Sequence, residues 1–188
     1  PRQILRRQLA RLAERGMSAK AATELEFIVF RNTNEEAWKK GFHDLEPANL
    51  YNIDYSLLGT ARVEPLIRRI RNEMAGAGME VENSKGECNL GQHEINFHYG
   101  PALCTADDHE IYKNGAKEIA FINGCSITFM AKPFQDWIGN SCHIHSSLWR
   151  DGKACFATDE ELFSRWLAGQ IACFKELAVF LAPTINSY

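Results

Sequence analysis

The sequence predicts an α+β fold with a mostly antiparallel β-sheet that has one polar, metal-binding face and helices packed on the other. Two observations lead to this fold class. Strand-like segments follow one another through short links and alternate in blocks with segments of helical periodicity. In addition, three of the strands carry apolar residues on one face and carboxylates or imidazoles on the other. The 188 residues suffice for one domain with its own core, or for part of a larger one.

Four stretches have the periodicity of an amphipathic helix. In the second, an apolar stripe is followed by two glycines, which favour a helix end. The third begins with two aspartates, which are favourable near the positive end of a helix. The fourth opens with Thr158 and Glu161, the spacing of a capping box. We therefore expect helices over Ile4–Ala13, 63–74, 107–122 and 158–181.

Five segments between the helices are predicted to be strands. They cover Ala22–Phe30, Val81–Glu87, His93–Tyr99, Ser126–Lys132 and His143–Trp149. The segment from Asn32 to Thr60 is rich in Asn, Gly, Asp and Tyr and is predicted to be a long loop. Loops of that length are uncommon unless they serve a function, so this segment is a candidate functional region.

Composition and charge exclude several classes of protein. The formal net charge is −3, whereas a nucleic-acid-binding domain normally carries a strongly basic surface. No apolar run is long enough to cross a membrane, and no signal-peptide pattern stands at the start. The six cysteines form no C-x-x-C pair and are expected to be reduced core residues. We therefore expect a cytoplasmic protein with no nucleic-acid or membrane partner.

Side chains alternate across a strand, so residues two apart share a face. In TELEFIVF, Glu24 and Glu26 lie on one side, and Leu25, Phe27 and Val29 lie on the other. Two further strands divide in the same way. Their polar sides hold Glu94, Asn96 and His98 in HEINFHYG, and His143, His145 and Ser147 in CHIHSSLW. Their apolar sides hold Ile95, Phe97 and Tyr99, and Cys142, Ile144 and Leu148.

A solvated face is the ordinary explanation for any one strand of this kind. Solvated faces normally mix Lys, Arg, Thr and Ser, however, whereas these positions hold Glu and His with almost no basic counterion. Carboxylates gathered in a partly desolvated cleft take up protons or bind cations. A set dominated by oxygen donors favours Mg²⁺ or Mn²⁺ over zinc. A zinc site would recruit Cys142 or Cys88, and the alternation turns Cys142 away from His143.

Glu87 and Glu94 are seven residues apart, which would place them on opposite faces of an unbroken strand. Asn89 and Gly91 lie between them, and both are turn residues. We therefore expect a hairpin that returns the two carboxylates to one side.

The order of these motifs resembles the catalytic domain of the glutamine synthetase family. The motifs are Glu24-x-Glu26, Glu87, GQHE ending at Glu94, MAKP at Met130–Pro133, and the His143-x-His145 strand. The resemblance runs from about Glu24 to the terminal NSY and implies that residues 1–188 are part of one catalytic domain. It also implies that an N-terminal β-grasp domain and the C-terminal part of the catalytic domain are absent here.

The resemblance implies a site for two divalent ions and for ATP. One ion would be held by Glu26, Glu87 and Glu94. The other would be held by Glu24 and His143, together with a glutamate from a segment outside this chain. The implied nucleotide-binding residues are Glu82, His145, Ser147 and Tyr99. Gly139 matches a glycine of the glutamate-binding loop, and Glu87 and Tyr51 are the implied catalytic residues, with Tyr51 at the ammonium pocket.

The implied reaction is a ligation. ATP would phosphorylate the γ-carboxylate of glutamate, and ammonia or a larger amine would displace phosphate from the acyl phosphate. Mg²⁺ or Mn²⁺ would neutralise the charge that develops on the transferred phosphoryl group. The resemblance also implies that the full-length protein is a homo-oligomeric ring and that this part alone is inactive.

The sequence departs from the family pattern at one place. Family members typically carry N-G-S-G before the first histidine, whereas this chain reads Ile138, Gly139, Asn140, Ser141. The GNSCHIH segment resembles those of relatives that join glutamate to amines larger than ammonia. Two alternatives stay open: a catalytically silent structural or binding protein, and a two-metal amidohydrolase.

Overall fold

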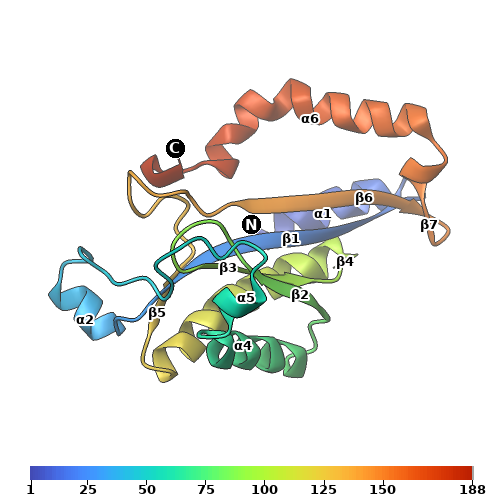
Figure 1. Cartoon of the computed structure of the whole chain (residues 1–188). Helices are drawn as coiled ribbons and strands as arrows, with labels where there is room; N and C mark the ends of the chain where they lie inside the picture. Colours follow the sequence, from blue (N-terminus) through green and yellow to red (C-terminus); the bar gives the residue numbers. More distant parts are fainter. Residues whose placement is uncertain (188) are drawn as a thin grey trace. The chain divides into compact units, whose positions relative to one another are not determined.

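The computed structural model describes residues 1–187, and Figure 1 shows its elements along the chain. The helices are α1 (Arg2–Ala13), α2 (Asn34–Lys39), α3 (Leu57–Thr60), α4 (Glu64–Gly76), α5 (Ala102–Ile122) and α6 (Glu160–Leu181), with 3₁₀ turns at Cys155–Ala157 and Ile185–Ser187. The strands are β1 (Ser18–Phe30), β2 (Val81–Gly86), β3 (Gln92–Phe97), β4 (Gly100–Pro101), β5 (Ser126–Thr128), β6 (Cys142–Arg150) and β7 (Lys153–Ala154). Tyr188, the last residue of the NSY motif, lies outside the described residues.

The strand pairs β1–β3, β1–β4, β1–β5, β2–β3 and β6–β7 are all antiparallel. This confirms the predicted α+β class with an antiparallel sheet. The contacts divide the chain into two compact units. The central unit comprises Thr23–His98 and Asp107–His143, and the terminal unit comprises Pro1–Ala22, Tyr99–Ala106 and the residues from Ile144 onwards.

In the central unit, β3 lies between β2 and β1, and β5 pairs with the last residues of β1. The register of β1 and β3 places Glu26 opposite Glu94 and Leu25 opposite Ile95. Residues paired in this way lie on the same face of the sheet. Leu25 and Ile95 are both buried in the core, which confirms the division of these strands into a polar and an apolar face.

The apolar face of this sheet packs against α4 and α5 (Figure 1). The helical part of the core consists of Leu66, Ile67, Ile70 and Met74 from α4 and Tyr112, Ala116, Ile119 and Ala120 from α5. The four α4 residues follow the three- and four-residue spacing of one helical face. Full burial of each large apolar side chain contributes roughly 1.5–3 kcal/mol. The polar residues of β1 and β3 therefore lie on the side of the sheet that faces away from these helices.

The terminal unit contains α1, the first residues of β1, β4, β7, α6 and β6 from Ile144 onwards. Lys20 of β1 lies opposite Pro101 of β4, and β6 pairs with β7. Apolar side chains of α6 are exposed, including Phe174 at 64%. Within residues 1–187, the structure contains no helix that combines the length and apolar character needed to span a membrane.

The start of α6 corrects the sequence prediction. Its N-cap is Asp159, whose side chain accepts a hydrogen bond from Leu162 N at 2.9 Å. The predicted capping box of Thr158 and Glu161 is wrong, because the Thr158 hydroxyl instead donates to Cys155 O at 3.5 Å. An aspartate is at least as good an N-cap as a threonine, so the N-cap lies at residue 159 rather than at residue 158.

Two other segments also differ from expectation. The helix predicted from residue 107 begins at Ala102, directly after Pro101, whose missing N–H costs nothing at a helix start. The segment Asn32–Thr60 is not a plain loop, because it contains α2 and α3. A complete capping box opens α2: Thr33 Oγ1 accepts from Glu36 N, and the Glu36 carboxylate accepts from Thr33 N.

The cysteines are free, as expected. Their expected core location is wrong for Cys104, Cys142 and Cys173, which are exposed, whereas Cys155 is buried. A cysteine is small and only weakly polar, so composition alone does not decide between these locations.

Candidate active site

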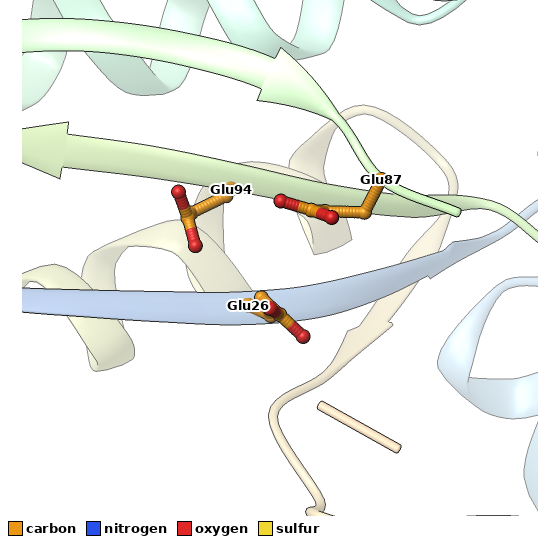
Figure 2. Close-up of side chains that lie close together, drawn as sticks. All are labelled: Glu26, Glu87 and Glu94. Carbon is orange, nitrogen blue, oxygen red and sulfur yellow. The ribbon is translucent and has the colours of Figure 1, made fainter. Parts of the chain in front are cut away.

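Three glutamates converge on the polar face of the central unit (Figure 2). Glu26 lies on β1, Glu94 lies opposite it on β3, and Glu87 follows directly after β2. One carboxylate oxygen of each lies within 4.8 Å of the others. Glu94 is 2% exposed and Glu87 is 9% exposed, so these like charges are held largely out of water. The structure thus brings together the three residues that the family resemblance assigns to one ion.

The predicted hairpin between Glu87 and Glu94 is present. Glu87 N donates to Gln92 O at 3.0 Å, which closes the turn. Gly91 has a φ of 65° within it, and a Cβ at this position would lie 2.6 Å from Val29 O. Both the backbone conformation and the close approach require glycine. The turn returns Glu87 to the side of the sheet that carries Glu94, as the spacing predicted.

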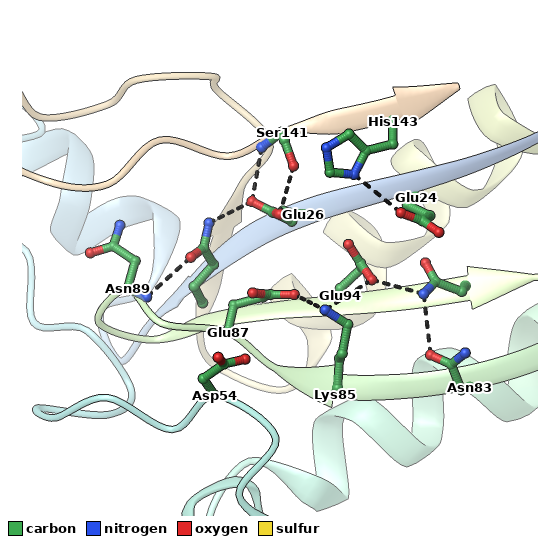
Figure 3. Close-up of polar contacts among 12 residues, drawn as sticks. Glu24, Glu26, Asp54, Asn83, Lys85, Glu87, Asn89, Glu94, Ser141 and His143 are labelled. Atoms are coloured by element: carbon green, nitrogen blue, oxygen red, sulfur yellow. Dashed lines mark hydrogen bonds and ion pairs between the residues drawn. The ribbon is translucent and has the colours of Figure 1, made fainter. Parts of the chain in front are cut away.

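Glu26 is fixed by hydrogen bonds from two other segments (Figure 3). Ser141 N donates to Glu26 Oε2 at 2.8 Å, and Ser141 Oγ donates to Oε1 at 2.6 Å. Gln92 Nε2 donates to Oε2 at 2.9 Å. Three hydrogen bonds from two segments hold the Glu26 carboxylate in one orientation.

Gln92 links the hairpin to the segment before β6. It is 1% exposed, and besides Glu26 its Nε2 lies 3.0 Å from Gly139 O and 2.9 Å from Asn140 Oδ1. Its Oε1 accepts a hydrogen bond from Asn89 N at 3.1 Å. The amide therefore joins residues that are distant in sequence, and it fixes the loop that carries Ser141 relative to Glu26.

Asn140 explains why β5 is shorter than predicted. The strand ends at Thr128 rather than at Lys132. Beyond it, Asn140 Nδ2 donates to Met130 O at 2.9 Å, and Asn140 N donates to Ala131 O at 2.7 Å. An asparagine thus satisfies backbone acceptors that a neighbouring strand would otherwise satisfy.

Gly139 lies in this loop with no room for a side chain, because a Cβ would lie 2.5 Å from Ala131 O. We expect Gly139→Ala to lower the free energy of unfolding by about 1–3 kcal/mol, since backbone must move to relieve the clash. Urea denaturation of the full-length protein measures this change. Gly76→Ala is the matched control, because apart from its chain neighbours and the backbone of its own helix no atom lies within 4 Å of the added Cβ. Equal stability of the two variants would contradict the close approach.

Lys85 also lies on the polar face, so the expectation of almost no basic counterion is wrong. It lies on β2 directly opposite Glu94. Its ammonium group donates to Glu87 Oε1, and it lies 3.4 Å from Glu94 Oε1 (Figure 3). The alternation in β1, β3 and β6 alone does not reveal this lysine, because it lies on β2.

The two partners of this ion pair respond differently to their surroundings. Burial acts to lower the pKa of Lys85, but the hydrogen bond to Glu87 and the charges of Glu94 and Glu87 outweigh it and raise that pKa. Burial also raises the pKa of Glu87, and the neighbouring Glu26 and Glu94 add to this effect against the opposing effect of Lys85. One ammonium group therefore does not fully compensate three carboxylates, and the cluster keeps a demand for further positive charge.

Glu24 and His143 form a second polar pair in the central unit. His143 Nδ1 lies 3.1 Å from Glu24 Oε2, and the two side chains are 62% and 35% exposed. The family resemblance assigns both residues to one ion, and the structure brings them together. With a further ligand they could hold an ion, whereas alone they are an exposed hydrogen-bonded pair.

The donor chemistry of the three-glutamate cluster fits a hard divalent ion. All three ligands are carboxylates, which suit Mg²⁺ or Mn²⁺ rather than zinc. Although Cys142 is an exposed residue, partial burial of its thiol raises the pKa, which disfavours the thiolate form that binds metals. Burial alone lowers the pKa of His93 to about 4, which keeps this core histidine neutral, and its ring lies 6.2 Å from that of Phe27. His93 is thus on the opposite face from Glu94 and is no candidate ligand.

Comparison with known proteins identifies the fold. The profile of the glutamine synthetase catalytic domain matches residues 1–188. The chain belongs to the glutamine synthetase family. It is 58% identical to γ-glutamylethanolamide synthetase GlnA4 of Streptomyces coelicolor and 35% identical to glutamate–isopropylamine ligase of a Pseudomonas species. Both alignments cover 100% of the chain but only 41% and 42% of these proteins, so the chain spans about two-fifths of their length.

A solved structure described as a novel glutamine synthase homolog matches with a TM-score of 0.83 at 25% identity, over 98% of this chain and 42% of that chain. GmaS in complex with ADP matches with a TM-score of 0.88 at 32% identity, over 100% of this chain and 44% of GmaS. The resemblance seen in the sequence motifs is therefore confirmed.

Other residues selected from the glutamine synthetase motifs lie outside the three-glutamate cluster. In the central unit, Glu82 is exposed where the register of β2 shifts, and Tyr51 is 59% exposed between α2 and α3. In the terminal unit, His145 is exposed, and Ser147 Oγ accepts a hydrogen bond from Trp149 Nε1 at 2.9 Å. Their functional roles stay predictions.

The placement of Tyr99 on the apolar face is wrong. The alternation stops at Phe97, where β3 ends, and Tyr99 is 55% exposed. Its ring stacks on Trp149 with centroids 6.0 Å apart, and Lys20 Nζ lies 3.7 Å from the Trp149 ring. Ile144 was also assigned to an apolar face, yet it is 61% exposed.

Three residues that position the glutamates were not predicted from the sequence: Gln92, Ser141 and Lys85. Gln92 and Ser141 lie inside the motifs GQHE and GNS, but neither residue type is a strong metal ligand, so ligand chemistry alone does not identify them. Lys85 could have been found by sorting β2 by face, because it lies two residues before Glu87.

Proposed function

We propose that the full-length protein is an ATP-dependent ligase that joins the γ-carboxylate of glutamate to an amine through a γ-glutamyl phosphate. The convergence of Glu26, Glu87 and Glu94 within 4.8 Å is the observation that carries this proposal. Membership of the glutamine synthetase family supports it, and so do the names of the two relatives, which are both ligases or synthetases of glutamate and an amine.

We assign Glu26, Glu87 and Glu94 to one divalent ion, and Glu24 and His143 to a second. Bound Mg²⁺ or Mn²⁺ would supply positive charge that neutralises the negative charge of the phosphoryl group during its transfer. The chain's own residues prepare for this: Gln92 and Ser141 orient the Glu26 carboxylate through three hydrogen bonds. Preorientation of this kind removes reorganisation from the reaction step.

Nucleotide binding is assigned to Glu82, His145, Ser147 and Tyr99, and GmaS in complex with ADP supports use of an adenine nucleotide. The exposed Tyr99 ring, stacked on Trp149, has the flat aromatic surface that a base needs. Gly139 is assigned to the glutamate-binding loop, and Tyr51, with Glu87, to catalysis at the amine. The cytoplasmic location and the homo-oligomeric ring that the resemblance implies remain part of the proposal.

The amine acceptor is proposed to be larger than ammonia. The relative with 58% identity is a γ-glutamylethanolamide synthetase, and the next is named for isopropylamine. Ile138 stands where the family typically has an asparagine, and its side chain is 54% exposed. An exposed apolar side chain beside the glutamate loop suits an acceptor that carries carbon atoms better than it suits ammonium.

Phosphate release by the full-length protein tests the proposal. With ATP, glutamate and Mg²⁺, we expect phosphate release to be faster with ethanolamine than with the same concentration of ammonium. Isopropylamine serves as a second acceptor that carries carbon atoms. Omission of glutamate or of Mg²⁺ should abolish the signal. Faster release with ammonium would overturn the acceptor assignment. Absence of metal-dependent nucleotide binding in calorimetry would overturn the ligase, and hydrolysis of γ-glutamyl amides without nucleotide would indicate the amidohydrolase instead.

A further inference from the structure

Lys85 places a positive charge among the carboxylates assigned to an ion. Three neighbouring strands present Lys85, Glu94 and Glu26 side by side, because Lys85 pairs with Glu94 and Glu94 pairs with Glu26. The Lys85 ammonium group contacts both Glu87 and Glu94. Its side chain is only 22% exposed, so this charge is directed into the cluster rather than into solvent.

We propose that Lys85 is a tethered counter-ion that occupies part of the ion position in the ion-free protein and leaves when a divalent ion binds. The inference rests on the proposed function, since it takes Glu26, Glu87 and Glu94 as ion ligands. It assigns a role to a residue that supplies no ligand atom: Lys85 sets how tightly the site holds its ion.

Geometry prevents both cations from using the same oxygens at once. A carboxylate-bound Mg²⁺ lies about 2.1 Å from its ligand oxygens. An ammonium group that contacts Glu87 and lies 3.4 Å from Glu94 Oε1 would then be a near neighbour of that ion. The repulsion is twice that between two unit charges at the same distance, and burial weakens the screening by water. The lysine therefore has to move before the ion is fully bound.

The structure offers a second position for the ammonium group. Lys85 Nζ already lies 4.8 Å from the centre of the Tyr55 ring. Tyr55 is 73% exposed, and its backbone N donates to Gly86 O at 3.3 Å, which keeps its loop beside the end of β2. The lysine stem has four flexible carbons, so rotation about it can carry the charge outward across this ring. An aromatic face that stays close to water stabilises such a cation moderately.

Substitution of Lys85 in the full-length protein tests this role. Lys85→Met removes the competing charge and keeps a long apolar stem. We expect its Mn²⁺ affinity, measured by calorimetry without nucleotide, to rise about 10-fold, because the ion no longer displaces an ammonium group. In chelator, thermal unfolding of the variant should occur at a lower temperature than that of the parent, because three carboxylates then lack a counter-ion.

Two further variants of Lys85 separate the effect of its charge from the effect of its size. Lys85→Arg retains the charge, so its Mn²⁺ affinity should stay close to that of the parent protein, and Lys85→Gln should bind more tightly, even where the methionine variant fails to fold. Lys39→Met on α2 is the control for loss of a surface lysine. Unchanged or weaker Mn²⁺ binding by both neutral variants would overturn the counter-ion role alone. A parent protein that binds no Mn²⁺ would instead overturn the ion site, and with it the proposed function.

Discussion

Replacement of Glu26 by glutamine in the full-length protein is expected to reduce ligase turnover by about 100-fold or more while the protein stays folded. Glutamine has nearly the same shape as glutamate, and its carbonyl oxygen can still accept from Ser141 N and Gln92 Nε2 at the position of Oε2. Its NH₂ group can donate to Ser141 Oγ. The substitution thus removes the negative charge and one ligand oxygen, and it keeps the hydrogen bonds. Steady-state phosphate release measures the loss.

Stability measured on the same Glu26→Gln variant separates an enzyme from a silent relative. The ion-free protein should be as stable as the parent or more stable, because one of three like charges is removed. In Mn²⁺ the parent should gain stability that the variant does not, because only the parent binds the ion fully. Alanine is a poorer choice, because it would leave three donors without an acceptor. Glu73→Gln, in an exposed pair with Arg69, is the control. A variant with full turnover would exclude Glu26 as a ligand.

Replacement of Phe27 by alanine is expected to lower the free energy of unfolding by about 3–5 kcal/mol. Phe27 is fully buried on the apolar face of β1, and its ring lies 5.4 Å from that of Phe129. Truncation removes most of a buried ring and leaves a cavity between the sheet and the helices. Urea denaturation of the full-length protein measures the effect.

Two control variants show whether the stability loss in Phe27→Ala comes from the lost buried ring. Phe27→Leu keeps most of the side-chain volume and should lower the free energy of unfolding by about 1.5 kcal/mol or less. Phe121→Ala removes the phenyl ring of a residue on α5 that is 52% exposed. It should lower the free energy of unfolding much less than Phe27→Ala does. Equal losses for the two alanine variants would show that Phe27 is not the core residue that the structure describes.

The elements that the sequence predicted correctly are those with a strong period. Alternation in β1 and β3 assigned Glu26 and Glu94 to one face, and the register confirms it. The turn residues before Gln92 predicted the hairpin. The motif order then predicted the family, which the profile match confirms. These features depend on local spacing, which a single sequence contains.

The features that the sequence did not predict depend on contacts between distant residues. The Asn140 side chain donates a hydrogen bond to a backbone carbonyl group beyond β5, and no local sequence pattern predicts such a bond. For Lys85, the spacing to Glu87 is local, but its proximity to Glu94 depends on the pairing of β2 with β3. Tyr99 was misplaced because alternation holds only as far as the strand continues, and strand ends are poorly marked in sequence.

The anchoring of Glu26 has a consequence for how the protein is made. Its partner Ser141 is 115 residues further along the chain, whereas Lys85 is only two residues from Glu87. A ribosome releases Glu26, Lys85, Glu87 and Glu94 well before Ser141 emerges, so the growing chain can pair lysine with glutamate long before Glu26 is held in place. Orientation of the Glu26 carboxylate by Ser141 is then a late event of biosynthesis, whereas Lys85 can neutralise part of the acidic charge before that point.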